Sequence, residues 1–444
     1  MPALPLVAII GRPNSGKSTL FNALTYSNQA IVSATPGTTR DHVAAVVHGA
    51  TASYLLIDTG GIGGGSEDRE LERDVEKQSL LALERADLIL LTFDCRSEML
   101  KSDHAVVDIL RKKKRRHVPV LLAVTKCERK GERETAEYEY HDLGIASAIV
   151  PVSAVQKIGL AELRSTIDDA LVKLHFGKAP QNPNVPRIAL VGKPNVGKSS
   201  IINALMSDPS RERSPRLISP IPGTTRDPSD TIVQHGEHRF TFVDTAGIRQ
   251  RAKIRESIEE LSMLRSIQAV TEATVTIVVI DAATRITVQD KRIARMALNS
   301  GSGLLLLLNK GDLLSGKEKQ ERMAEIRASL PFCSFAPALF CSAKTLDGLL
   351  KIFPILAMIH QNRERRIATK ELQRWYTEVI QRMPARVLAQ GKHVTQTSDI
   401  PPTFVLFSKN PKGIPVSYLR YLERSMRSTW AFEGTPIRWI TKRS

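Results

Sequence analysis

The sequence has few cysteines and no long apolar run, features that mark disulfide-rich, zinc-finger and membrane proteins. Its 4 cysteines, Cys95, Cys127, Cys333 and Cys341, are spaced neither like a zinc finger nor like a disulfide framework, which favours a reducing compartment. Its apolar runs, such as Leu304–Leu308, have the length of a buried strand, far below the roughly 20 residues of a membrane-spanning helix. We therefore expect no membrane span. The first ten residues read as a strand rather than a targeting segment.

The sequence also has fewer acidic than basic residues. The chain has 63 Lys and Arg against 46 Asp and Glu, a formal net charge of +17 over 444 residues. Such an excess points to a polyanion, either nucleic acid or an anionic membrane surface, with a merely solvated surface as the alternative. Residues 363–444 hold 16 Lys or Arg and 6 Asp or Glu, and Arg111–Arg116 reads RKKKRR. We expect both regions to contact phosphate groups.

Four short motifs occur twice in the same order. GRPNSGKS at Gly11–Ser18 returns as GKPNVGKS at Gly192–Ser199, so that Lys198 follows Lys17 by 181 residues. PGTTRD, DTGGI and TKCE return as PGTTRD, DTAGI and NKGD at offsets of 184 to 186 residues. A near-constant offset over four motifs indicates a duplicated domain.

Within each copy, apolar strands alternate with amphipathic helical segments. Strands followed by motifs predict a doubly wound α/β domain, whose ligands lie at the carboxyl ends of the strands. The strands expected in the first copy are Leu6–Ile10, Tyr54–Ile57, Leu88–Phe93 and Val120–Val124. The domains expected are 1–174 and 187–362, a proline-containing linker at 175–186, and a third domain at 363–444.

The C-terminal segment has a different pattern. Helical spacing of Leu372, Trp375 and Tyr376 predicts a helix behind a cap at Thr369, and Ser417 can cap a second helix. The strands expected here are Val394–Thr397, Thr403–Phe407 and Ile437–Ile440. The resulting order α-β-β-α-β describes a small α+β domain.

GxxxxGK[ST] directly after an apolar strand predicts a P-loop, in which backbone N–H groups and a helix N-terminus face a phosphate chain. Lys17 and Lys198 should reach the β- and γ-phosphates, and Ser18 and Ser199 should ligate Mg²⁺. A glycine-rich turn without a ligand is the alternative. The residues assigned to the nucleotide are Gly11, Arg12, Pro13, Asn14, Ser15, Gly16, Lys17 and Ser18 in the first copy, and Gly192, Lys193, Pro194, Asn195, Val196, Gly197, Lys198 and Ser199 in the second.

A DxxG motif follows each P-loop by about 40 residues. Its aspartate can hold Mg²⁺ through water, and its glycine N–H can approach the γ-phosphate. Thr39 and Thr225 lie between the two motifs, in segments suited to a switch that orders on Mg²⁺ and γ-phosphate. The predicted metal ligands are Ser18, Thr39, Asp58, Ser199, Thr225 and Asp244. The further nucleotide contacts are Thr59, Gly60, Gly61 and Ile62, and Thr245, Ala246, Gly247 and Ile248.

Base recognition separates the two copies. In NKGD, Asp312 can accept two hydrogen bonds from guanine, a donor pair that adenine lacks, while Asn309 ties loops together. Thr125 and Glu128 replace these residues in TKCE, so guanine binding by the first copy stays open; a lost hydrogen bond to a charged group costs about 1.5–3 kcal/mol. The residues assigned to the base are Thr125, Lys126, Cys127, Glu128, Ser153 and Ala154, and Asn309, Lys310, Gly311, Asp312, Ser342 and Ala343.

This set of motifs resembles the translational-factor-like GTPases, and nearly the whole chain resembles the Der/EngA family of ribosome-assembly GTPases. Distinctive matches are PNxGKS in both P-loops, PGTTRD in both switches, Thr287–Asp290 (TVQD), Pro401–Phe407 (PPTFVLF) and Gly434–Arg438 (GTPIR). The resemblance implies two tandem P-loop GTPase domains with doubly wound, mostly parallel sheets, followed by a small α+β KH-like domain. It implies GTP, GDP and Mg²⁺ as ligands.

The resemblance also implies a catalytic set. Asn14 and Asn195 match the position that coordinates a monovalent cation in related potassium-activated GTPases, where K⁺ acts in place of an arginine finger. Stabilisation of the loop by asparagine is the alternative. Ile62 and Ile248 stand where signalling GTPases have a water-orienting glutamine, so slow hydrolysis is expected. The catalytic residues expected are Asn14, Lys17, Thr39, Asn195, Lys198 and Thr225.

The implied partner is the precursor of the large ribosomal subunit with its rRNA, bound by a monomer, with no membrane involved and with domain 2 as the switch. A largely non-catalytic rRNA-binding scaffold with a degenerate first site is the alternative. No GXXG occurs in residues 363–444, so clamping of single strands is not expected. The expected location is the cytoplasm, on ribosomes, or else a mitochondrial or plastid matrix with the targeting segment outside this numbering. The arginines expected to face RNA are Arg363, Arg365, Arg366, Arg420, Arg424 and Arg427.

Overall fold

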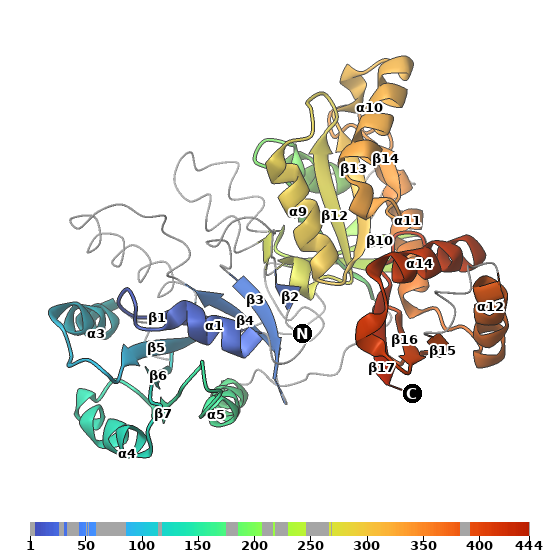
Figure 1. The fold of residues 1–444 in the computed structure, drawn as a ribbon. Helices are drawn as coiled ribbons and strands as arrows, with labels where there is room; N and C mark the ends of the chain where they lie inside the picture. The colour runs from blue at the N-terminus through green and yellow to red at the C-terminus, as the bar shows by residue number, and fades with distance from the viewer. Residues whose placement is uncertain are drawn as a thin grey trace. The chain divides into compact units, whose positions relative to one another are not determined.

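The computed structural model describes residues 5–25, 31–32, 44–49, 51, 53–58, 86–113, 118–174, 185–206, 216–217, 230–245, 266–267, 269–381 and 391–443 (Figure 1). The chain divides into two compact units, Met1–Gln181 with Ser257–Gln268, and Asn182–Glu256 with Ala269–Ser444. Most of the predicted linker at 175–186 lies outside the described residues. In the part of the chain that the structure describes, no helix has the length and apolarity to cross a membrane.

The first unit contains a seven-stranded sheet in the order β2-β3-β4-β1-β5-β6-β7. β4, β1, β5, β6 and β7 run parallel, and β2 and β3 extend the β4 edge as antiparallel strands. The strands are β1 (Leu6–Ile10), β2 (Ile31–Val32), β3 (Ala44–His48), β4 (Ser53–Asp58), β5 (Leu88–Asp94), β6 (Val120–Thr125) and β7 (Ala148–Pro151). The helices are α1 (Lys17–Thr25), α3 (Lys101–Lys113), α4 (Lys130–Glu139), η2 (His141–Leu143) and α5 (Leu160–Lys173).

The central strands of this sheet are apolar along their whole length because both faces are covered. Every residue of β1, β5 and β6 is buried, the pattern of a parallel sheet between helices rather than of a half-exposed strand. Phe21 of α1 and Leu163 of α5 belong to one core cluster with Val7, Leu90 and Leu121 of the sheet. The four strands predicted in the first copy are confirmed as β1, β4, β5 and β6.

The second unit repeats this topology. Its seven-stranded sheet has the order β14-β13-β12-β8-β11-β10-β9, again parallel except at the β10 and β9 edge. The strands are β8 (Arg187–Val191), β9 (Arg216–Leu217), β10 (Thr231–His235), β11 (His238–Phe242), β12 (Val275–Asp281), β13 (Gly303–Asn309) and β14 (Ala338–Phe340). The helices are α6 (Lys198–Met206), α9 (Val288–Asn299), η3 (Gly311–Leu313), α10 (Gly316–Ser329), η4 (Pro331–Cys333), η5 (Leu349–Lys351) and α11 (Ile352–Glu364).

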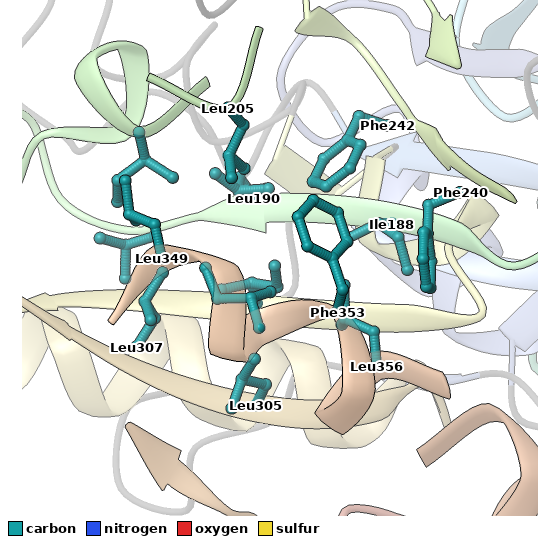
Figure 2. Close-up of a cluster of buried hydrophobic side chains, with 14 of the residues drawn as sticks. Ile188, Leu190, Leu205, Phe240, Phe242, Leu305, Leu307, Leu349, Phe353 and Leu356 are labelled. Carbon is teal, nitrogen blue, oxygen red and sulfur yellow. The ribbon is translucent and has the colours of Figure 1, made fainter. Parts of the chain in front are cut away.

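The core of this sheet forms against α6 and α11 (Figure 2). Alternate residues of β12, namely Val275, Ile277 and Val279, face the same cluster as Phe353 of α11, as the period of two of a strand requires. α9 contacts β12 and β13 but contributes no residue to this cluster, so it covers the other face. The sheet is therefore buried between two helical layers.

The C-terminal domain has the predicted order α-β-β-α-β among its described residues. Its elements are α12 (Thr369–Gln381), β15 (Gly391–Gln396), β16 (Thr403–Ser408), η6 (Pro411–Gly413), α14 (Val416–Trp430) and β17 (Arg438–Arg443). β16 pairs antiparallel with β15 and parallel with β17. The expectation that Ser417 caps α14 is wrong: Pro415 holds the N-cap position without a side-chain hydrogen bond, and Ser417 is the second residue of the helix. Thr369 is the first residue of α12 rather than its cap.

Hydrogen bonds from main-chain and side-chain donors join the C-terminal domain to the second GTPase domain. Leu304 N donates to Gly434 O at 2.7 Å, Gly434 N donates to Phe335 O at 2.8 Å, and Asn362 Nδ2 donates to Glu433 O at 3.0 Å. α11 continues to Glu364, across the boundary predicted at 362/363. The second GTPase domain and the C-terminal domain are therefore connected through α11 and through the start of β13.

Two arginines expected to face RNA instead make contacts within the protein. Arg363 is buried in α11 and donates to Gly301 O, and burial lowers its pKa to about 10. Arg427 pairs with Glu423 at 2.8 Å, and its guanidinium lies 4.4 Å from the ring centroid of Phe335. The expectation of RNA contact is wrong for Arg363, because a side chain buried in the protein cannot meet a phosphate.

Phe353→Ala should destabilise the second unit. The Phe353 ring is buried, lies 4.5 Å from the His235 ring and 5.4 Å from the Phe240 ring, and its loss would leave a cavity costing about 3–5 kcal/mol of the free energy of unfolding. All 3 tryptophans belong to the C-terminal domain of the same unit, so tryptophan fluorescence during urea unfolding measures the effect. Leu350→Ala, at a 43% exposed residue, is the control, and equal losses in both variants would contradict the expectation.

Candidate nucleotide sites

Each P-loop occupies the turn between a central strand and a helix. Asn14 and Asn195 both have φ of 63°, and Gly16 and Gly197 have φ of 85° and 95°, so the two loops follow the same left-handed turns. A Cβ at Gly192 would lie 2.4 Å from Val279 O of the neighbouring strand β12. Only glycine allows this close approach, which presses the loop onto the sheet.

The P-loop lysine is held by carbonyl groups of its own loop. Lys17 Nζ donates to Gly11 O at 2.9 Å and to Arg12 O at 2.7 Å. Lys198 Nζ donates to Gly192 O at 2.8 Å and to Lys193 O at 2.6 Å. Burial lowers the pKa of Lys17, and the nearby Asp58 carboxylate opposes this shift. The ammonium group is thus fixed at the mouth of the loop in both copies.

The residues expected at the first metal site lie together. Ser18 Oγ, at the start of α1, donates to Asp58 Oδ2 at 2.6 Å, and Asp58 is the buried last residue of β4. A hydroxyl and a carboxylate oxygen are hard donors of the kind that Mg²⁺ prefers, so the pair fits this ion. Asp244 follows β11 with φ of 51°. The other predicted contacts in these motifs, Thr39, Thr225, Thr59, Gly60, Gly61, Ile62, Ala246, Gly247 and Ile248, lie outside the described residues.

The predicted base-reading loop of the second domain, Asn309–Asp312, makes hydrogen bonds with two other loops. Asn309, which ends β13, donates through Nδ2 to Val196 O at 2.8 Å and accepts through Oδ1 from Ala343 N at 3.0 Å. It thereby joins the P-loop to the loop at Ser342 and Ala343. The Asp312 carboxylate is exposed, and its pKa is lowered mainly by a hydrogen bond with Ser342. Asp312 therefore presents an ionised acceptor.

The same loop of the first domain differs in contacts as well as in sequence. The Thr125 hydroxyl lies 2.7 Å from Ser15 O and 2.9 Å from Phe93 O, so it keeps the link to the P-loop. Glu128 Oε1 lies 2.7 Å from a terminal nitrogen of Arg96. Cys127 is buried and its thiol donates to Val124 O, so only its backbone can face a base.

Sequence reasoning missed residues that hold these loops. Lys126 Nζ lies 2.5 Å from Asp94 Oδ2, and Lys310 Nζ lies 2.5 Å from Asp281 Oδ2. Each aspartate ends the strand before the base-reading strand, β5 or β12. Their repeat at an interval of 187 residues was a signal in the sequence. Arg96 has no such signal, because Ala283 holds the matching place in the second copy.

Comparison with known proteins agrees with this arrangement. A family model described as 50S ribosome-binding GTPase matches residues 6–126 and 187–310, and one described as the C-terminal KH-domain-like region of EngA bacterial GTPase enzymes matches 366–442. The chain is 40% identical to GTPase Der of Agathobacter rectalis over 99% of its own length and 98% of the relative's. It is 39% identical to GTPase Der of Symbiobacterium thermophilum over 98% and 91%.

Among solved structures, the chain is similar to Era from Aquifex aeolicus, with 17% identity, coverage of 59% of this chain and 93% of that chain, and a TM-score of 0.30.

The duplicated P-loops and sheets define a P-loop GTPase with two nucleotide domains in tandem and a KH-like domain after them. The chain belongs to the Der (EngA) family, since its relatives match it over nearly the whole length. The predicted resemblance and fold class are confirmed. The protein is a GTPase, which uses GTP and GDP with Mg²⁺.

Arg96→Met should raise the affinity of the first domain for GDP. Arg96 occupies an oxygen of the carboxylate predicted to accept from guanine, and an exposed ion pair is worth about 0.2–1 kcal/mol, so its release gives up to about a fivefold gain. A fluorescent GDP analogue, titrated into the full chain carrying Lys198→Ala, measures this site. Arg129→Met, at a neighbouring exposed arginine, is the control. Unchanged or weaker binding by Arg96→Met would contradict the expected competition.

Proposed function

We propose that this GTPase is an assembly factor of the large ribosomal subunit, whose affinity for rRNA is set by the nucleotide bound to its second domain. One observation carries the proposal. β13 begins at Gly303, and its second residue, Leu304, donates a main-chain hydrogen bond to Gly434 of the C-terminal domain. The strand ends at Asn309, the first residue of the base-reading loop. A single buried strand, β13, therefore connects the base-reading loop with the C-terminal domain.

The C-terminal domain supplies the surface for RNA. Arg420 and Arg424 are one turn apart on α14 and both are exposed, as are Lys409, Lys442 and Arg443. Phosphate contacts of this kind give affinity without base specificity. The matching family description, which names the 50S ribosome, supports the large subunit as the partner. We place the protein as a monomer on ribosomes in the cytoplasm, with an organelle matrix as the alternative.

For hydrolysis we assign a monovalent cation to the P-loop asparagines. Asn14 and Asn195 are exposed at the same left-handed position of the two loops, where an amide oxygen can coordinate K⁺ beside the phosphates. Charge that develops between β- and γ-phosphates would be stabilised there. In this proposal Lys17, Lys198, Thr39 and Thr225 complete the catalytic sets, and turnover is slow.

The two domains divide the work unequally. Asn309 and Asp312 give the second domain a complete guanine loop, whereas Glu128 of the first is engaged by Arg96. That ion pair favours a degenerate first site, as in the alternative of an rRNA-binding scaffold with little catalysis. The behaviour of the second domain decides between switch and scaffold.

GTP hydrolysis should be faster in potassium than in sodium, and Asn195→Gly in a chain carrying Lys17→Ala should abolish this difference. Glycine allows the φ of 63° that Asn195 adopts, so the variant removes the side-chain oxygen without straining the turn. Phosphate release in the two salts at equal ionic strength measures the effect. A potassium stimulation that survives in Asn195→Gly would assign the asparagine to loop conformation alone, and equal native rates in both salts would refute the cation site.

Binding to large subunits should depend on both salt and nucleotide. If about six phosphates are neutralised, affinity should fall on the order of 10³ between 50 and 200 mM salt, and Arg420→Gln with Arg424→Gln should reduce the log–log slope by about two. Lys198→Ala should keep binding but lose nucleotide-dependent release. Co-sedimentation with purified subunits measures all three. Release that is unchanged in Lys198→Ala supports the scaffold, and insensitivity to salt contradicts rRNA contact.

A further inference from the structure

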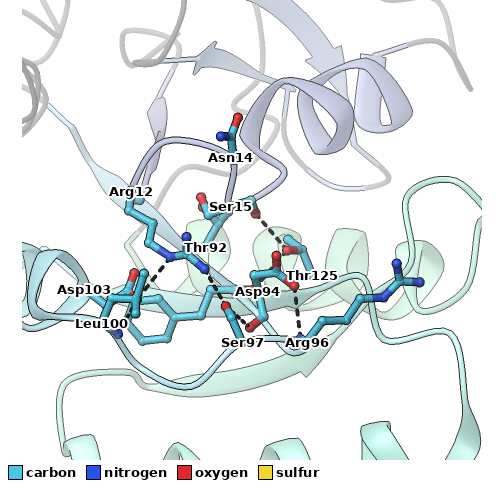
Figure 3. A network of polar contacts seen from close by, with 12 residues as sticks. Arg12, Asn14, Ser15, Thr92, Asp94, Arg96, Ser97, Leu100, Asp103 and Thr125 are labelled. Atoms are coloured by element: carbon cyan, nitrogen blue, oxygen red, sulfur yellow. Dashed lines mark hydrogen bonds and ion pairs between the residues drawn. The ribbon is translucent and has the colours of Figure 1, made fainter. Parts of the chain in front are cut away.

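In both GTPase domains the second residue of the P-loop motif has a positively charged side chain that forms an ion pair with an aspartate at the start of a helix. In the first domain Arg12 Nε lies 3.1 Å from Asp103 Oδ2 of α3, and Arg12 also donates to Ser97 Oγ (Figure 3). In the second, Lys193 Nζ lies 2.8 Å from Asp290 Oδ2 of α9. The cation differs between the copies while the pairing is kept, so the pairing is the shared feature.

Both carboxylates are fixed independently of the cation. Asp103 and Asp290 are only 3% and 2% exposed. Asp103 Oδ2 accepts from Leu100 N at 3.0 Å, before the start of α3. Asp290 Oδ2 accepts from Thr287 N at 2.8 Å and closes the capping box of α9, which gives a structural role to the TVQD segment. Each helix start therefore offers a rigid anion toward the P-loop.

The anchored residue also carries the carbonyl that holds the P-loop lysine. Arg12 O accepts from Lys17 Nζ at 2.7 Å, and Lys193 O accepts from Lys198 Nζ at 2.6 Å. The side chain of one residue is thus held by the carboxylate while its carbonyl faces the ammonium group. The side-chain anchor and the carbonyl that accepts from the lysine therefore belong to the same residue.

We propose that Asp103 and Asp290 are positioning residues of the two GTP sites. They act through Arg12 and Lys193, whose anchoring fixes the P-loop backbone and the lysine that meets the nucleotide phosphates. The inference rests on the proposed assignment of Lys17 and Lys198 to those phosphates. It adds α3 and α9 to the elements that determine nucleotide affinity.

A purely structural ion pair would behave differently. Its loss would lower the melting temperature but leave the GDP affinity of the folded protein unchanged. A positioning role lowers affinity in protein that is still folded, and a cation able to reach Asp290 should restore it. Affinity and melting temperature are therefore measured on the same variants.

The test uses the full chain with Lys17→Ala, so that a fluorescent GDP analogue reports the second domain. Asp290→Asn and Lys193→Met should each weaken binding about tenfold, because each breaks the ion pair that holds the P-loop side chain. The double variant should be no weaker than the worse single variant, because both remove the same interaction. Lys193→Arg, which places in this domain the residue of the first, should recover most of the loss caused by Lys193→Met.

Lys291→Met removes an exposed lysine of the same helix and should leave affinity as it is. Affinities of Asp290→Asn and Lys193→Met within twofold of the parent, or losses that add in the double variant, overturn the proposal. If Asp290→Asn does not fold, the comparison of Lys193→Met with Lys193→Arg decides. A parent chain that binds no guanine nucleotide would overturn the site assignment itself, an outcome distinct from equal affinities in parent and variants.

Discussion

The close contact between the P-loop and the neighbouring strand is the constraint on which both nucleotide sites depend. Gly11 lies against Thr92 of β5, and Gly192 lies against Val279 of β12, at distances that no Cβ could share. The contact lies on central strands of each sheet, β5 and β12. These apolar strands are buried, since helices cover both faces.

The duplicated domains show which features the site tolerates and which it keeps. The lysine bound by loop carbonyls and the aspartate partner of Lys126 or Lys310 occur in both copies. The differences gather at the base-reading loop, where an amide that joins two loops is replaced by the Thr125 hydroxyl. The two copies thus share the P-loop backbone and its lysine contacts, while the side chains of the loop after the fourth parallel strand differ without disturbing the fold.

The sequence allowed the fold to be predicted well because its signals are local. Buried parallel strands such as Leu88–Asp94 and the GxxxxGK[ST] loops are continuous stretches, and the repeat fixed their order. Contacts between distant segments were not predictable in the same way. The pair of Arg96 and Glu128 joins two loops 32 residues apart, and Arg363 looks like a surface arginine until α11 places it against Gly301. Charged residues are mostly exposed, and the sequence alone does not single out the exceptional buried one, so Arg363 was wrongly expected at the surface.

The difference between buried and exposed arginines shows that only part of the net charge of +17 is available to a polyanion. Burial lowers the pKa of Arg363, Arg427 and Arg438, all in the segment that carries much of the positive excess. Arg363 donates to Gly301 O, while Arg427 donates to Phe432 O, pairs with Glu423 and lies over the Phe335 ring. The cations open to a polyanion are those such as Arg420 and Arg424 on α14. The contact of Arg427 with Phe335 joins α14 to the second GTPase domain, so part of the positive charge of this segment stabilises the junction and another part stays exposed on α14.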